Sequence, residues 1–158
     1  MSEQTITGGC LCGAIRYEVP TRPGGAIICH CRRCQRLSGS AFATGTLYPR
    51  EHFRMTQGEP LWYESSQLLS RAFCGECGSQ LFSLTKFPGT EDSISVSIGS
   101  HDDPNLVPVA IHTGVESQQA WLKLDDGLPR HELSDSFVED TISGKDSRYK
   151  DLLPDTLK

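Results

Sequence analysis

The stretch Cys29-His30-Cys31-Arg32-Arg33-Cys34 places three cysteines within six residues, and it is one of three such groups. The other two are Cys10-Leu11-Cys12 and Cys74-Gly75-Glu76-Cys77, and the three groups together contain all seven cysteines of the chain. Spacings of one or two residues let a tight backbone turn direct two thiolates at one ion, as in zinc sites. The cysteine pattern therefore predicts a fold that metal ions help to hold together.

Three other uses of the cysteines fit these spacings less well. Disulfides would leave one thiol over, and cysteines one residue apart pair poorly with each other. Residues 1–9 are polar and lack the apolar core of a secretory signal, so we expect a reducing, cytoplasmic location. The spacings do not follow the ferredoxin patterns of iron–sulfur clusters. A redox dithiol at Cys74 and Cys77 is the third alternative.

Size and composition indicate a turn-rich β protein. The chain has 158 residues, 37% of them hydrophobic, with 15 glycines and 9 prolines. A formal charge of −5 argues against nucleic acid as a partner, and no apolar run is long enough to span a membrane. We expect a zinc-binding domain over residues 1–135 and a polar C-terminal tail over residues 136–158.

Most of the chain reads as short strands, and no segment keeps helical periodicity over a dozen residues. A short helix is expected over residues 32–38, with Gly39 ending it. Residues 53–56 and 61–63 flank a turn at 57–60 and predict a hairpin. The expected strands are residues 14–19, 26–29, 42–47, 53–56, 61–63, 69–73, 80–84, 93–98 and 107–112.

The cysteines divide most economically into four and three. Cys10, Cys12, Cys74 and Cys77 would form a closed, structural site of four thiolates. The other three, Cys29, Cys31 and Cys34, would form a second site with one open position. A thiol bound there would lose its proton and could attack an aldehyde. Two alternatives remain: the second and third groups share ligands, or another residue such as His30 closes the second site.

Residues near the second group are candidate substrate contacts. Arg32, Arg33 and Arg36 could receive the carboxylates of an acidic thiol, although they equally fit a solvated helix face. Ser40 lies in a turn whose backbone N–H groups could face the site. Trp121 is a candidate pocket residue, and a plain core aromatic is the alternative.

Three motifs, at residues 9–17, 29–40 and 73–81, resemble those of the glutathione-dependent formaldehyde-activating enzyme family, which includes centromere protein V. The resemblance runs from about residue 7 to 129. It implies a mainly β, zinc-pinned β-tent with short helices, a fold shared with a Rab-binding chaperone. It also implies a structural zinc on Cys10, Cys12, Cys74 and Cys77, and a catalytic zinc on Cys29, Cys31 and Cys34.

The resemblance implies an activity as well. The family joins formaldehyde and glutathione into S-(hydroxymethyl)glutathione, which is a carbon–sulfur lyase reaction run in reverse. We therefore expect a zinc-dependent enzyme of this type acting on a thiol–aldehyde adduct, with two zinc ions per chain and glutathione as co-substrate. The alternative is a non-enzymatic zinc-binding scaffold or protein-binding module.

Overall fold

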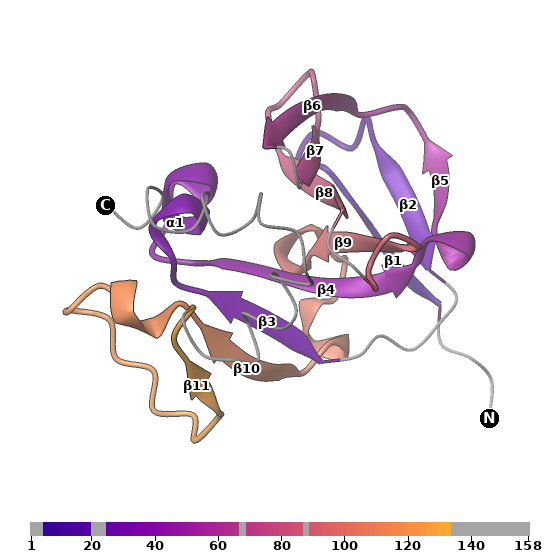
Figure 1. Ribbon diagram of the computed structural model, residues 1–158. Helices are drawn as coiled ribbons and strands as arrows, with labels where there is room; N and C mark the ends of the chain where they lie inside the picture. The colour runs from indigo at the N-terminus through magenta and orange to yellow at the C-terminus, as the bar shows by residue number, and fades with distance from the viewer. Residues whose placement is uncertain (1–4, 20–24, 67–68, 87–88, 134–158) are drawn as a thin grey trace. The chain divides into compact units, whose positions relative to one another are not determined.

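The fold consists mainly of β-strands, which confirms the class predicted from the sequence. Figure 1 shows the computed structural model, in which α1 (Arg32–Ser38) is the one α-helix of the described residues. The structure describes residues 5–19, 25–66, 69–86 and 89–133. The predicted polar tail, residues 136–158, lies outside this set. Within the described set, no helix is both long enough and apolar enough to cross a membrane.

Two compact units make up the chain, and each combines segments that are far apart in the sequence. Unit 1 contains Met1–Ala26 and Gly45–Pro108. Unit 2 contains Ile27–Thr44 and Val109–Lys158. The predicted four-cysteine set therefore belongs to unit 1, whereas the three-cysteine group belongs to unit 2.

A small antiparallel sheet in unit 1 positions the first cysteine group. Its strands lie in the order β1 (Ile6–Gly9), β2 (Arg16–Val19) and β5 (Arg54–Gln57). Buried and exposed side chains alternate along β1 and β2, so that Tyr17 and Val19 point into the core. The turn between β1 and β2 carries Cys10 and Cys12.

A larger set of antiparallel strands in unit 1 positions the third cysteine group. Buried and less buried side chains alternate along β4 (Ala43–Pro49) and β9 (Ser93–Ser97), which buries residues such as Tyr48 and Val96. Cys74 directly follows β7 (Leu69–Phe73), and β8 (Gln80–Thr85) begins soon after Cys77. In sheet order the strands are β4 (Ala43–Pro49), β9 (Ser93–Ser97), β8 (Gln80–Thr85), β7 (Leu69–Phe73) and β6 (Leu61–Ser66).

Aromatic rings fill the core of unit 1. The Tyr17 ring packs against Phe53 and Phe82, with ring centroids 5.5 and 5.1 Å apart. Buried hydroxyls require partners, and the Tyr48 hydroxyl has His101 Nε2 at 3.0 Å. Burial raises the pKa of Tyr48 to about 12. The described residues of unit 1 also form the 3-10 helices η1 (Arg50–His52), η2 (Ile98–Ser100) and η3 (Pro104–Leu106).

Unit 2 brings the second cysteine group together with the C-terminal part of the described chain. Strand β10 (Val109–Thr113) lies between β3 (Ala26–Cys29) and β11 (Arg130–His131). The β10 and β11 strands are parallel. The 3-10 helix η4 (Val115–Ser117) follows β10.

Helix α1 begins and ends where the sequence predicted. Its N-cap is Cys31, whose side chain accepts a hydrogen bond from the backbone N–H of Cys34. Its C-cap is Gly39, at a left-handed φ of 62° that glycine adopts without strain. The expected helix over residues 32–38 is therefore confirmed.

The hairpin predicted around residues 57–60 is wrong, although strands occur on both sides of it. The β5 strand pairs with β2, whereas β6 pairs with β7 in the larger set. Gly58 has a φ of 65°, and a Cβ there would lie 2.2 Å from the carbonyl oxygen of Ala14. Gly58 is thus needed because the backbone passes close to the first cysteine turn. The residue types at positions 57–60 would be the same for this connection and for a hairpin, so the sequence could not distinguish them.

Candidate metal centres and pocket

Four cysteines of unit 1 converge on one point. The Sγ atoms of Cys10, Cys12, Cys74 and Cys77 all lie within 4.8 Å of one another. Cys10 Sγ and Cys12 Sγ are 3.5 Å apart, and Cys12 Sγ and Cys74 Sγ are 3.8 Å apart. Tetrahedral zinc with bonds of about 2.3 Å requires sulfur separations of about 3.8 Å. The cluster therefore fits a zinc ion in both donor type and spacing.

Hydrogen bonds of the backbone turns orient these four cysteine side chains toward one another. The N–H of Ile15 donates to Cys10 Sγ at 3.2 Å, which orients the first knuckle. In the other knuckle the N–H of Gly78 donates to the Cys74 carbonyl at 2.8 Å. The hydrogen bond with the Ser79 hydroxyl lowers the pKa of the Cys77 thiol to about 6. Cys77 thus favours the thiolate form that a metal ion requires, whereas the hydrogen bond with Cys10 contributes to raising the pKa of Cys12.

The remaining three cysteines form a second cluster in unit 2. The Sγ atoms of Cys29, Cys31 and Cys34 also lie within 4.8 Å of one another, and Cys29 Sγ is 3.5 Å from Cys31 Sγ. Among the described residues, no fourth Cys, His, Asp or Glu ligand atom shares this space. His30, which stands between two of the cysteines, is not part of the cluster. The donor set fits zinc with three sulfur ligands and one further position.

Hydrogen bonds among the three thiols shift their pKa values in opposite directions. Contacts from Cys29 and Cys34 lower the pKa of the Cys31 thiol to about 2. The same contact with Cys31 raises the pKa of Cys29 to about 11, and contacts with both neighbours raise that of Cys34. A metal ion must displace the protons held by Cys29 and Cys34. Metal affinity at this cluster therefore rises with pH.

Two residues that the sequence prediction omits hold the second cluster in place. Buried Gln35 donates from Nε2 to the carbonyls of His30, at 2.5 Å, and Ser117, at 2.8 Å. Gly114 has a φ of 64°, and a Cβ there would lie 2.9 Å from the backbone nitrogen of Cys31. The position of Gln35 next to Cys34 was an available signal, whereas nothing local to Gly114 indicates its contact.

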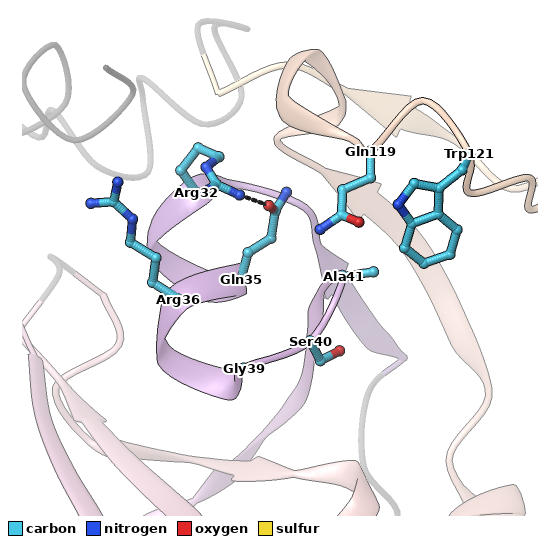
Figure 2. Close-up of a pocket in the computed structure, with 8 residues that line it drawn as sticks. All are labelled: Arg32, Gln35, Arg36, Gly39, Ser40, Ala41, Gln119 and Trp121. Atoms are coloured by element: carbon cyan, nitrogen blue, oxygen red, sulfur yellow. Dashed lines mark hydrogen bonds between the residues drawn. The ribbon is translucent and has the colours of Figure 1, made fainter.

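A cavity of about 430 Å³ lies beside α1 in unit 2. Figure 2 shows the three α1 side chains on one side of it and Gln119 and Trp121 on the other. The lining residues are Arg32, Gln35, Arg36, Gly39, Ser40, Ala41, Gln119 and Trp121. Four of the predicted substrate contacts, namely Arg32, Arg36, Ser40 and Trp121, are thus brought together.

The three arginines of α1 differ in their surroundings. Arg32 donates to Gln35 Oε1 and is held by that contact. Arg36 lines the cavity, and within the described part of the chain no hydrogen bond or ion pair engages its guanidinium. Arg33 is not among the residues that line the cavity. Trp121 is 70% exposed, so its indole is accessible rather than part of the core.

A family model described as glutathione-dependent formaldehyde-activating enzyme matches residues 5–117. The chain belongs to this family. This match confirms the resemblance that was drawn from the three cysteine motifs. All seven cysteines of the chain lie in the matched region. Family membership supports glutathione-dependent formaldehyde activation or a related carbon–sulfur lyase reaction.

The comparison with solved structures supports the fold, as the following example shows. The example is the crystal structure of a Rhodobacter sphaeroides protein, a structural genomics target, with a TM-score of 0.51 and 18% sequence identity. The alignment covers 79% of this family member and 98% of the Rhodobacter chain. At this identity the likeness shows the fold alone. No curated protein matches the chain.

Proposed function

We propose that this protein joins formaldehyde to a thiol with an acidic tail, such as glutathione, and also catalyses the reverse cleavage. In the forward direction the thiolate sulfur bonds to the carbonyl carbon, and the carbonyl oxygen takes up a proton to become a hydroxyl. The reverse step removes that proton and releases the aldehyde. The observation that carries the proposal is the cluster of Cys29, Cys31 and Cys34, which gathers three sulfur ligands in a unit without any other cysteine.

Both cysteine clusters are proposed to hold zinc. Four thiolates in unit 1 leave no open position, so that site would be structural. Zinc at Cys29, Cys31 and Cys34 would leave one position open and lower the pKa of a thiol bound there. The chain itself orients this site through Cys31, which is buried and fixed as the N-cap of α1.

The cavity beside α1 is proposed to hold the tail of the thiol. Cys34 lies on the same helix as the two arginines that line the cavity, so one short element serves the metal site and the pocket. Arg36 would receive a carboxylate of the tail, since its planar guanidinium suits bidentate pairing. The exposed Trp121 indole would cover the apolar part of the tail.

Replacing Arg36 with glutamine is expected to raise KM for glutathione about tenfold, because one charge-assisted hydrogen bond to a carboxylate is lost. The kcat should change little, since a contact with the tail is equal in ground and transition states. Steady-state kinetics with glutathione and with uncharged 2-mercaptoethanol would measure both effects. With 2-mercaptoethanol, KM and kcat should be the same for the variant and the parent.

Arg33→Gln is the matched control for this variant. It removes the same charge from the same helix, but Arg33 does not line the cavity. We expect KM for glutathione to stay close to the parent value. Equal increases in KM for the two variants would instead indicate a general electrostatic effect, and would contradict the proposal that this cavity binds the tail of the thiol.

The function itself is tested by exchange NMR with ¹³C-labelled formaldehyde and glutathione. The two compounds also combine spontaneously, so the measured quantity is the acceleration of exchange between free formaldehyde and the adduct. Zinc-loaded protein should accelerate this exchange, and the chelator-treated protein should not. An exchange rate that stays at the spontaneous value with zinc-loaded protein would contradict the proposal.

A binding module is the second candidate, and strand β6 favours it. Leu61, Trp62 and Tyr63 are consecutive and all exposed, and β6 ends the order of its sheet. Exposed apolar side chains on an edge strand are typical of protein-binding surfaces. This candidate predicts two bound zinc ions without any acceleration of adduct exchange.

A further inference from the structure

A series of hydrogen bonds leads from the surface of unit 2 to His30, the residue between two cysteines of the second cluster. Asp126 Oδ2, an exposed carboxylate oxygen, is 2.8 Å from His112 Nε2. His112 Nδ1 is in turn 2.9 Å from His30 Nε2, and the two rings stack with centroids 5.2 Å apart. Both histidines are fully buried, and His30 lies between Cys29 and Cys31.

The chemistry of the three side chains determines which atom donates and which accepts in each of these hydrogen bonds. An ionised carboxylate only accepts hydrogen bonds, so His112 must donate from Nε2. The hydrogen bond with His112 lowers the pKa of Asp126, which keeps the carboxylate ionised. Neutral His112 then accepts at Nδ1, and His30 donates from Nε2. Both imidazoles are therefore Nε2–H tautomers when His112 is neutral.

His30 is held at three points, and this matters for its two neighbours. Its ring is fixed by His112, its backbone N–H donates to the Thr113 carbonyl at 2.9 Å, and its carbonyl accepts from Gln35. Successive side chains in an extended segment point to opposite sides. Fixing the His30 ring on one side therefore directs the side chains of Cys29 and Cys31 to the other.

We propose that Asp126 and His112 are positioning residues for the Cys29–Cys31–Cys34 site and act on it through His30. Neither residue contacts the three sulfurs as a ligand, and Asp126 lies beyond the region that the family model matches. Partners that hydrogen-bond directly to metal ligands commonly change metal affinity by 10–100-fold. Asp126 and His112 act one residue further out, through His30, so we expect an effect at the lower end of this range. The inference rests on the proposed function only in requiring that this cluster binds zinc.

The first test measures zinc retention by native mass spectrometry while a chelator is titrated into the full-length protein. Asp126→Ala should lose one of its two zinc ions at a chelator concentration about tenfold lower than the parent does. Asp126→Asn should recover part of the affinity, because its amide oxygen can still accept from His112. The second zinc ion, held in unit 1, should be unaffected and serves as an internal reference.

Asp125→Ala is the matched control, since it removes the neighbouring exposed carboxylate, which takes no part in the hydrogen-bond chain. It should behave as the parent does. Equal zinc retention in Asp126→Ala and Asp125→Ala would overturn the inference. If the parent protein itself bound only one zinc ion, the metal assignment of the proposed function would fail instead, so the two failures are distinguishable.

The second test reads the tautomers directly, which loss of stability alone would not change. Long-range ¹H–¹⁵N correlation spectra at pH 8 should show His30 and His112 both protonated at Nε2 and unprotonated at Nδ1. In Asp126→Ala the His112 signals should move toward a mixture of tautomers, whereas Asp125→Ala should leave them unchanged. A protonated Nδ1 on His30 in the parent protein would show that the hydrogen bonds between Asp126, His112 and His30 have other donors and acceptors, and it would overturn the inference.

Discussion

Cys31→Ser should leave the protein with one zinc ion per chain and lower the rate of adduct exchange by more than about 100-fold. Loss of an outer partner alone costs 10–100-fold, and Cys31 is one of only three sulfurs proposed to hold the second ion. Its thiol is buried, and hydrogen bonds from Cys29 and Cys34 lower its pKa, which favours the thiolate form. A serine hydroxyl does not ionise at neutral pH and is a harder, weaker ligand for zinc.

This variant separates metal binding from folding of the helix. Cys31 caps α1, and serine is among the preferred N-cap residues, so the helix should persist. Native mass spectrometry would count the ions, circular dichroism would report the helix and sheet content, and exchange NMR would give the rate. Two retained zinc ions together with an unchanged rate would exclude this cluster as the reactive site.

Cys74→Ser should have the largest effect on stability. Cys74 is buried at the end of β7 and supplies one of four sulfurs in the unit 1 cluster. Binding of a structural zinc ion is part of the folding free energy, because the unfolded chain has no preformed site. Loss of such a metal belongs to the few changes that cost more than about 4 kcal/mol. For a chain of this size, that lowers the Tm by roughly 10 °C or more.

Thermal unfolding with and without a chelator would measure this effect. Excess chelator should bring the parent protein and Cys74→Ser to the same Tm, because both then lack every zinc ion, and the fall in Tm should be larger for the parent. Glu76→Gln is the control, because Glu76 is exposed in the same turn and is not part of the cluster. A Tm for Cys74→Ser equal to that of Glu76→Gln would mean that the cluster does not stabilise unit 1 through a metal ion.

The features that the sequence predicted well are those that short spacing controls. Cysteines one or two residues apart must lie close together in any compact turn, so the members of each group could be recognised directly. The end of helix α1 was predicted because Gly39 is a local stop signal. The alternation of Ile94 and Val96 similarly reveals the buried face of β9.

Which groups share an ion was a weaker inference, because the three spacings allow more than one division. The structure brings the turn after β1 and the turn after β7 together in unit 1, where Cys12 Sγ lies 3.8 Å from Cys74 Sγ, so the first and third groups are the ones that could share an ion. Arg33 and Arg36 illustrate the same limit at the pocket. Both were candidates from their charge, but only Arg36 lines the cavity.

Composition and spacing were therefore sufficient for the mainly β class, the cysteine groups and the helix, and the resemblance of the three motifs supplied the family. They could not show that β5 pairs with β2, that Gly114 packs against Cys31, or that His30 contacts His112, 82 positions away. Such contacts depend on which strands become neighbours in the folded chain, and many pairings satisfy the same local pattern. The long-range hydrogen bonds around the second cluster exist only once β3 and β10 lie side by side.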